Sequence, residues 1–88
     1  MALIPRLPRG VRLHHDRVRG VPVLLGPERA LILDEIGAAI LAELDGAALD
    51  EIVARLAVRY DAPVAEIGAD VRDFLDDLQT QRLVDYHA

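Results

Sequence analysis

The chain has 88 residues and a formal net charge of -5 at pH 7, and it contains no cysteine, lysine, serine or asparagine. This length suits one domain with a single modest core, and the acidic balance disfavours wrapping around nucleic-acid phosphates. The missing cysteines exclude disulfides, thiolate chemistry and cysteine-ligated metals.

The N-terminal residues 1–10 are predicted to form an extended arm, because Pro5 and Pro8 fix the backbone angle φ and remove hydrogen-bond donors. Two alternatives stay open for this arm: a frayed terminus, or docking on a second subunit or a partner enzyme. The same prolines interrupt the start of the chain before a signal-peptide core forms, and no apolar run approaches the roughly 20 residues of a membrane span. We therefore expect a cytoplasmic protein.

Residues 11–88 are predicted to form the single folded domain, which starts with three short antiparallel strands between Val11 and Leu33. Polar or Gly-Pro turns at Asp16 and at Gly26-Pro27 separate the strands. Pro22 is expected at a bulge or a strand start, because a proline in a central strand deletes a ladder hydrogen bond.

Three helices are predicted next, over about residues 34–45, 48–60 and 63–81. Asp34 is the expected cap of the first helix and Gly46 its terminator, whereas Ala48 gives the second helix a weak cap. The tail after Gln81 is predicted to be a short strand or an ordered segment. The expected buried stripes of the three helices are Ile36, Ala39, Ile40 and Leu44; Leu49, Ile52, Val53, Leu56 and Tyr60; and Ile67, Val71, Phe74, Leu75 and Leu78.

Three strands followed by a three-helix bundle indicate an α+β fold that is similar to the winged helix-turn-helix. Many proteins of that architecture place the third helix in the DNA major groove. Here the third helix carries one arginine, Arg72, against the five carboxylates of Glu66, Asp70, Asp73, Asp76 and Asp77. These charges repel phosphates, so DNA binding is disfavoured.

The sequence contains no recognisable catalytic, metal-binding or cofactor-attachment motif. A carrier protein with a phosphopantetheine arm needs a serine, and there is none. His14 and His15 are adjacent in a predicted strand, so their side chains point to opposite faces and do not chelate one ion together. We therefore predict no catalytic residue, no metal ligand and no cofactor. A small sheet with a free edge beside an amphipathic helix can instead accept an extended peptide as an added strand.

Several segments carry a family resemblance: PRLPRGVRLHHDRVRG, VLLGPERALILDEIGAAIL, LDEIVARLAVRYDAP and IGADVRDFLDDL. In this order they resemble the coenzyme PQQ synthesis protein D family of pyrroloquinoline quinone biosynthesis over nearly the whole chain. The resemblance implies a non-catalytic peptide chaperone. It would bind the ribosomally made PQQ precursor peptide and present it to a radical SAM enzyme.

In that family's mode of binding, the peptide pairs with the third strand and lies against the third helix. Carried onto this sequence, the peptide-binding strand comprises Glu28, Arg29, Ala30, Leu31, Ile32 and Leu33. At roughly 100° per residue, the third helix has two flanks beside its core stripe. One flank carries Gly68, Arg72, Leu75 and Gln79, and the other carries Asp70, Phe74, Asp77 and Gln81. We favour the first flank, because Arg72 could meet an acidic residue of the precursor.

Two other functions stay open: an interaction or regulatory domain that contacts only the partner enzyme, and a divergent DNA-binding regulator. The short strands also leave room for a homodimer in which the arm or a hairpin exchanges between subunits. A membrane partner is not expected.

Overall fold

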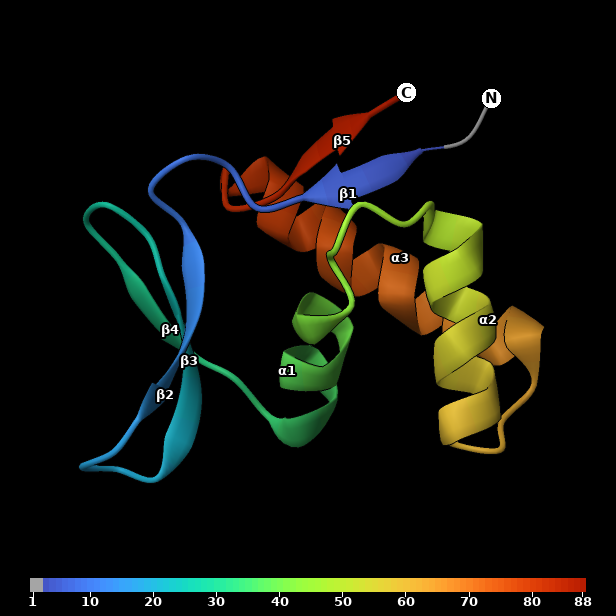
Figure 1. The fold of residues 1–88 in the computed structure, drawn as a ribbon, viewed down its shortest axis with the longest axis horizontal. Coiled ribbons are helices and arrows are strands. Elements are labelled where there is room, and N and C mark those ends of the chain that lie inside the picture. Colours follow the sequence, from blue (N-terminus) through green and yellow to red (C-terminus); the bar gives the residue numbers. More distant parts are fainter. Residues whose placement is uncertain (1–2) are drawn as a thin grey trace.

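The computed structural model describes residues 3–88, in which five strands and three helices form an α+β fold. The predicted three strands and three helices are all present, and two short terminal strands join them (Figure 1). In chain order the elements are β1 (Ile4–Arg6), β2 (Arg12–Asp16), β3 (Val21–Leu25), β4 (Ala30–Ile32), α1 (Glu35–Ala42), α2 (Leu49–Arg59), α3 (Val64–Thr80) and β5 (Asp85–His87).

The larger sheet has the order β2-β3-β4 and is antiparallel throughout. The proline expected to disturb it, Pro22, is the second residue of the central strand β3 and pairs with His15 of β2. Its missing N–H faces the β4 side, where its carbonyl accepts the Leu33 N–H at 2.9 Å. The sheet tolerates this proline because β4 ends at Ile32, so the lost ladder bond falls where the chain leaves the sheet.

The smaller sheet pairs β1 with β5, so that Ile4 lies opposite His87 and Pro5 opposite Tyr86. Part of the predicted N-terminal arm therefore packs on this chain's own C-terminal strand, a partner that the sequence reasoning did not consider. Residues 1–2 of that arm lie outside the described part of the chain. The Leu49 N–H donates to the carbonyl oxygen of Leu3 at 2.7 Å, which ties β1 to the start of α2.

Helix α1 begins as predicted, because the Asp34 carboxylate accepts the Gly37 N–H at 2.6 Å. The predicted terminator was wrong: α1 ends at Ala42, and Gly46 lies beyond its cap at Glu43. The Glu43 N–H already turns back to the carbonyl of Ile40, which tightens and closes the last turn. Gly46, with φ near 100°, instead shapes the turn into α2.

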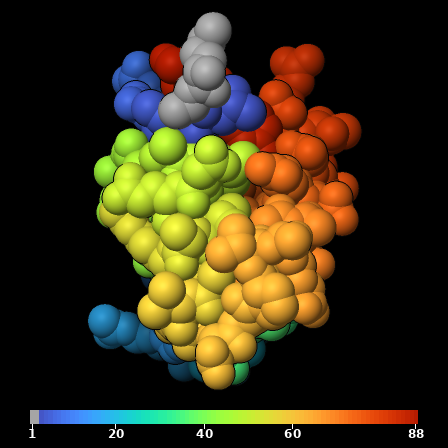
Figure 2. All heavy atoms as spheres, turned by 90° about the vertical axis from the view of Figure 1, so that its right-hand side faces the viewer, coloured from blue at the N-terminus to red at the C-terminus, as the bar shows by residue number. Residues whose placement is uncertain are grey.

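The other two helices start without a side-chain cap, at Ala48 for α2 and at Pro63 for α3. The weak cap predicted at Ala48 is therefore confirmed. Figure 2 views the molecule from the helical end, where α2 and α3 lie side by side beneath β1. The core between helices and sheet is aliphatic, and its most deeply buried side chains are Leu24, Ile52, Val71, Leu75 and Val84.

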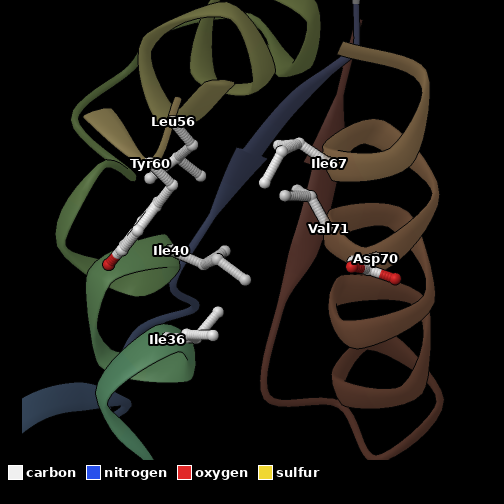
Figure 3. A pocket seen from close by; sticks show the side chains of 7 residues that line it. All are labelled: Ile36, Ile40, Leu56, Tyr60, Ile67, Asp70 and Val71. Carbon is white, nitrogen blue, oxygen red and sulfur yellow. The ribbon is translucent and has the colours of Figure 1, made fainter. Parts of the chain in front are cut away.

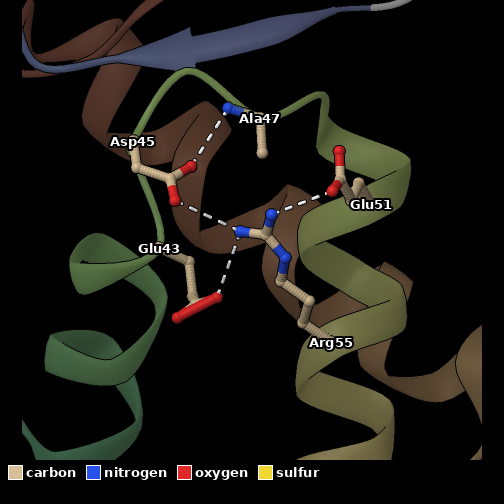
Figure 4. A network of polar contacts seen from close by, with 5 residues as sticks. All are labelled: Glu43, Asp45, Ala47, Glu51 and Arg55. Atoms are coloured by element: carbon tan, nitrogen blue, oxygen red, sulfur yellow. Dashed lines mark hydrogen bonds and ion pairs between the residues drawn. The ribbon is translucent and has the colours of Figure 1, made fainter.

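Arg55 fastens the loop between α1 and α2 (Figure 4). Its guanidinium lies 2.8 Å from Glu51, 3.4 Å from Asp45 and 3.5 Å from Glu43. Partial desolvation opposes its charge, but the three carboxylates outweigh that effect and raise the pKa of Arg55.

Within residues 3–88, no helix is both long enough and apolar enough to cross a membrane.

Candidate functional site

The three-stranded sheet has two free edges, one along β4 and one along β2. In an antiparallel pair, alternate residues point their N–H and C=O groups toward the partner strand. On β4, Arg29 accepts from the Gly26 N–H and Leu33 donates to Pro22, so the odd-numbered residues face β3. Ala30 and Ile32 therefore present two N–H and two C=O groups to the open edge. The same alternation leaves Leu13 and His15 open on β2.

The predicted peptide-binding strand was drawn longer than the strand that forms. Ala30, Leu31 and Ile32 make up β4, whereas Glu28 and Arg29 lie in the preceding turn and Leu33 follows the strand. Leu31 is half-buried against the core, and Ile32 is 62% exposed on the outer face. An added strand could thus contact an apolar side chain on either face of the sheet.

The predicted helix flank faces away from β4. Leu75 is fully buried, and a Cβ on buried Gly68 would lie 3.6 Å from Val53 of α2. Arg72 is exposed and approaches Asp50 of α2, with 3.8 Å between the charged atoms, and Gln79 is also exposed. Because α2 packs against this side of α3, the structure does not bring Arg72 and its neighbours together with the open edge.

The opposite flank of α3 lies along β4 and α1. The Arg29 guanidinium donates to Gln81 Oε1 at 2.7 Å, and the Gln81 amide donates to Asp77 at 3.1 Å. One turn earlier, Phe74 packs on α1 so closely that a Cβ on Gly37 would lie 3.1 Å from its ring. Sequence reasoning named this flank but preferred the other on charge. Gly68 was the signal against that choice, because a glycine within a helical stripe permits close approach of a second helix.

Beyond Phe74 an apolar slot opens between the helices (Figure 3). It encloses about 140 Å³. In Figure 3, Ile36 and Ile40 of α1 point toward Ile67 and Val71 of α3. The prediction that Ile36 is buried was wrong: Ile36 is 56% exposed, at the open mouth of this cavity. We call this cavity the slot; it is lined by Ile36, Ile40, Leu56, Tyr60, Ile67, Asp70 and Val71.

Charge is divided unevenly along the chain. Residues 1–33, which contain the larger sheet, carry six arginines and two carboxylates, whereas residues 34–88 carry four arginines and thirteen carboxylates. Arg29 and Arg82 line a hollow between the turn before β4 and the end of α3, whereas Asp70 lines the slot. Within residues 3–88, no three His, Cys, Asp or Glu side chains group closely enough to hold a metal ion.

Known proteins share this sequence and this fold. The family model described as coenzyme PQQ synthesis protein D (PqqD) matches residues 23–84. A protein of Rhizobium meliloti (strain 1021), named PqqA binding protein, is 51% identical over 83 residues, which cover 93% of this chain and 85% of that protein. A bifunctional coenzyme PQQ synthesis protein C/D of Methylorubrum extorquens is 43% identical over 93% of this chain, which corresponds to 22% of that protein.

Two solved structures are similar as well. The solution structure of the PqqD truncation of Methylobacterium extorquens PqqCD, described as a functional and stand-alone RiPP recognition element, gives a TM-score of 0.79 at 44% identity, over 92% of this chain and 87% of that one. The crystal structure of PqqD from Xanthomonas campestris gives a TM-score of 0.60 at 42% identity, over 88% and 87% of the two chains. The sequence match and the shared fold together show that this chain belongs to the coenzyme PQQ synthesis protein D family.

Proposed function

We propose that this chain binds the PQQ precursor peptide as an added strand along β4 and presents it to the radical SAM enzyme of the pathway, without covalent chemistry of its own. The observation that carries the proposal is the open edge at Ala30 and Ile32, next to the flank of α3 that carries Phe74 and Gln81. The names of the relatives, PqqA binding protein and RiPP recognition element, support this function.

Main-chain pairing alone gives modest affinity. Four new backbone hydrogen bonds at about 1 kcal/mol each stabilise the complex by about 4 kcal/mol, before the ordering of the peptide is subtracted. Side-chain contacts must therefore add to the strand pairing. Leu31, Phe74 and Ile36 provide apolar surface for such contacts.

Titration calorimetry with a synthetic precursor peptide tests this function. We expect saturable binding with one peptide per chain. An absence of heat and saturation at peptide concentrations of tens of micromolar would contradict the proposal. Because a bound strand buries apolar area, the heat capacity change of binding should be negative.

A second candidate function is an interaction domain that contacts only the partner enzyme. The existence of a relative in which the C and D proteins are one chain favours a close association of this fold with enzymes. Pull-down of the chain with the peptide alone and with the radical SAM enzyme alone separates the two functions. Capture of the enzyme without any capture of the peptide would favour the second.

A further inference from the structure

The slot combines a buried floor with an exposed apolar mouth. Ile40 and Val71 at its floor are almost completely buried, whereas Ile36 is more than half exposed at its edge. Its lining is almost entirely apolar, and Tyr60 and Asp70 are the lining residues whose side chains carry polar groups. An apolar cavity of about 150 Å³ is large enough to take up a small apolar group. A leucine-sized side chain fits these properties.

The slot lies beside the first turn of α1, the element that follows β4 in the chain. Helix α1 begins shortly after β4 ends, and Phe74 packs on Gly37 between the slot and the Arg29–Gln81 contact. One flank of α3, from Gln81 through Phe74 to Asp70, therefore runs past β4 and reaches the slot. An extended chain advances about 3.3 Å per residue. A peptide paired with Ala30 and Ile32 thus comes within reach of the slot a few residues later.

We propose that the slot binds one apolar side chain of the precursor peptide and thereby fixes the peptide's register on β4; this inference rests on the proposed function. Strand pairing reads no sequence, and a shift along the edge keeps the same kind of hydrogen bond. An anchored apolar side chain removes that ambiguity, because its burial in the slot stabilises one register over the others. Asp70 is the one charged residue of the lining, so an acidic side chain is repelled from this position.

The experiment compares two charge insertions by titration calorimetry with the precursor peptide. Ile36→Glu places a carboxylate at the mouth of the slot, at a position exposed enough to keep the fold. Val58→Glu is the matched control, because Val58 is 83% exposed on α2 and does not line the slot. We expect Ile36→Glu to weaken binding at least tenfold and Val58→Glu to change it less than twofold.

A peptide alanine scan then identifies the anchor. For one apolar peptide residue, substitution by alanine should weaken binding to the wild-type chain but have little further effect on binding to Ile36→Glu. The effects of the two substitutions on affinity are then not additive. In the wild-type complex, the protons of that peptide residue should give nuclear Overhauser contacts to the Ile40 methyl groups. Ile40 is only 3% exposed, so the contact requires a side chain inside the slot.

The outcomes separate the two proposals. If the wild-type chain binds the peptide but Ile36→Glu binds equally well, the slot is not an anchor and the strand-pairing function stands. Contacts to the Ile40 methyls from a second copy of the chain, instead of the peptide, would also overturn the anchor. If the wild-type chain does not bind the peptide, the proposed function fails and the anchor fails with it.

Discussion

The edge of β4 and the edge of β2 each leave two residues with open main-chain groups, Ala30 and Ile32 on one side and Leu13 and His15 on the other. The two edges therefore present the same number of open backbone N–H and C=O groups. They differ in the surface next to each edge. Just after β4 in the chain, Phe74 packs on Gly37 of α1, and the slot opens between α1 and α3. Beside β2 lies a hollow between the sheet and α1, whose α1 lining is Glu35 and three alanines, with Arg59 of α2 also in its lining.

Because the backbone groups are equivalent, we expect the side chains on and beside each edge to select the edge that binds. Charged side chains along an edge strand oppose unwanted pairing. Arg12 and Asp16 supply such charges at the two ends of β2, with the polar His14 and His15 between them, whereas β4 itself, residues Ala30–Ile32, is entirely apolar. We expect the β4 edge to bind the peptide and the β2 edge to stay free.

The largest effect is expected from proline substitutions on the two edges. Ile32→Pro deletes an N–H that faces the open side of β4, so the ladder with β3 survives while the pairing to a peptide is lost. We expect calorimetry to show affinity falling about 5–30-fold, the equivalent of about 1–2 kcal/mol.

His15→Pro is the control on the β2 edge, where it also deletes an outward N–H, and affinity should stay within twofold. Circular dichroism should show that both variants keep the fold. If His15→Pro weakens the peptide and Ile32→Pro does not, the two edges have been assigned the wrong way round.

A smaller effect distinguishes the two flanks of α3. Phe74→Leu keeps most of the side-chain volume but removes the ring beside β4 and α1, so binding should weaken about threefold by loss of aromatic contact. Arg72→Glu changes a side chain that lies on the α2 side, and binding should change less than twofold at physiological salt. If Arg72→Glu weakened binding more than Phe74→Leu, the flank of Arg72, which the sequence favoured, would be the one that contacts the peptide.

The smallest effect on peptide affinity is expected in the β1-β5 sheet, which contains neither the β2 edge nor the β4 edge. The Tyr86 hydroxyl donates to Asp76 at 2.7 Å, and partial burial together with this carboxylate raises the pKa of Tyr86. Tyr86→Phe should leave peptide affinity unchanged and lower the free energy of unfolding by about 1 kcal/mol at pH 7.

The pH dependence of that difference follows from the raised pKa. The neutral phenol stabilises the fold below the ordinary tyrosine pKa of about 10, and this stabilisation is lost as pH rises above it, because the unfolded chain ionises first. Urea unfolding at pH 7 and at about pH 10.5 should therefore show the gap between wild type and Tyr86→Phe narrowing. A gap that widens would contradict this reading of the Tyr86–Asp76 contact.

Local signals in the sequence were sufficient for much of the fold. The Asp34 cap, the weak start at Ala48 and the turn at Asp16 depend on neighbouring residues alone, and the structure contains all three. The pairing of β1 with β5 could not be predicted in this way, because Ile4 and His87 lie at opposite ends of the chain and neither strand is long enough to show a period.

The candidate site was less accessible to sequence reasoning. Helical spacing gave two flanks of α3, and the packing of α2 near Gly68 and Arg72 leaves the other flank facing α1 and the turn before β4. The exposure of Ile36 also depends on where α3 stands, because its spacing in α1 is that of a core residue. Contacts between residues far apart in the sequence thus decide where the candidate site forms, whereas neighbouring residues decide which helices and strands build it.

Amide hydrogen exchange followed by NMR, with and without the precursor peptide, tests the central claim most directly. Binding along β4 predicts that the N–H groups of Ala30 and Ile32 become protected when peptide is added, while those of Leu13 and His15 continue to exchange as in the free chain. Protection of Leu13 and His15 with no change at Ala30 and Ile32 would contradict the account.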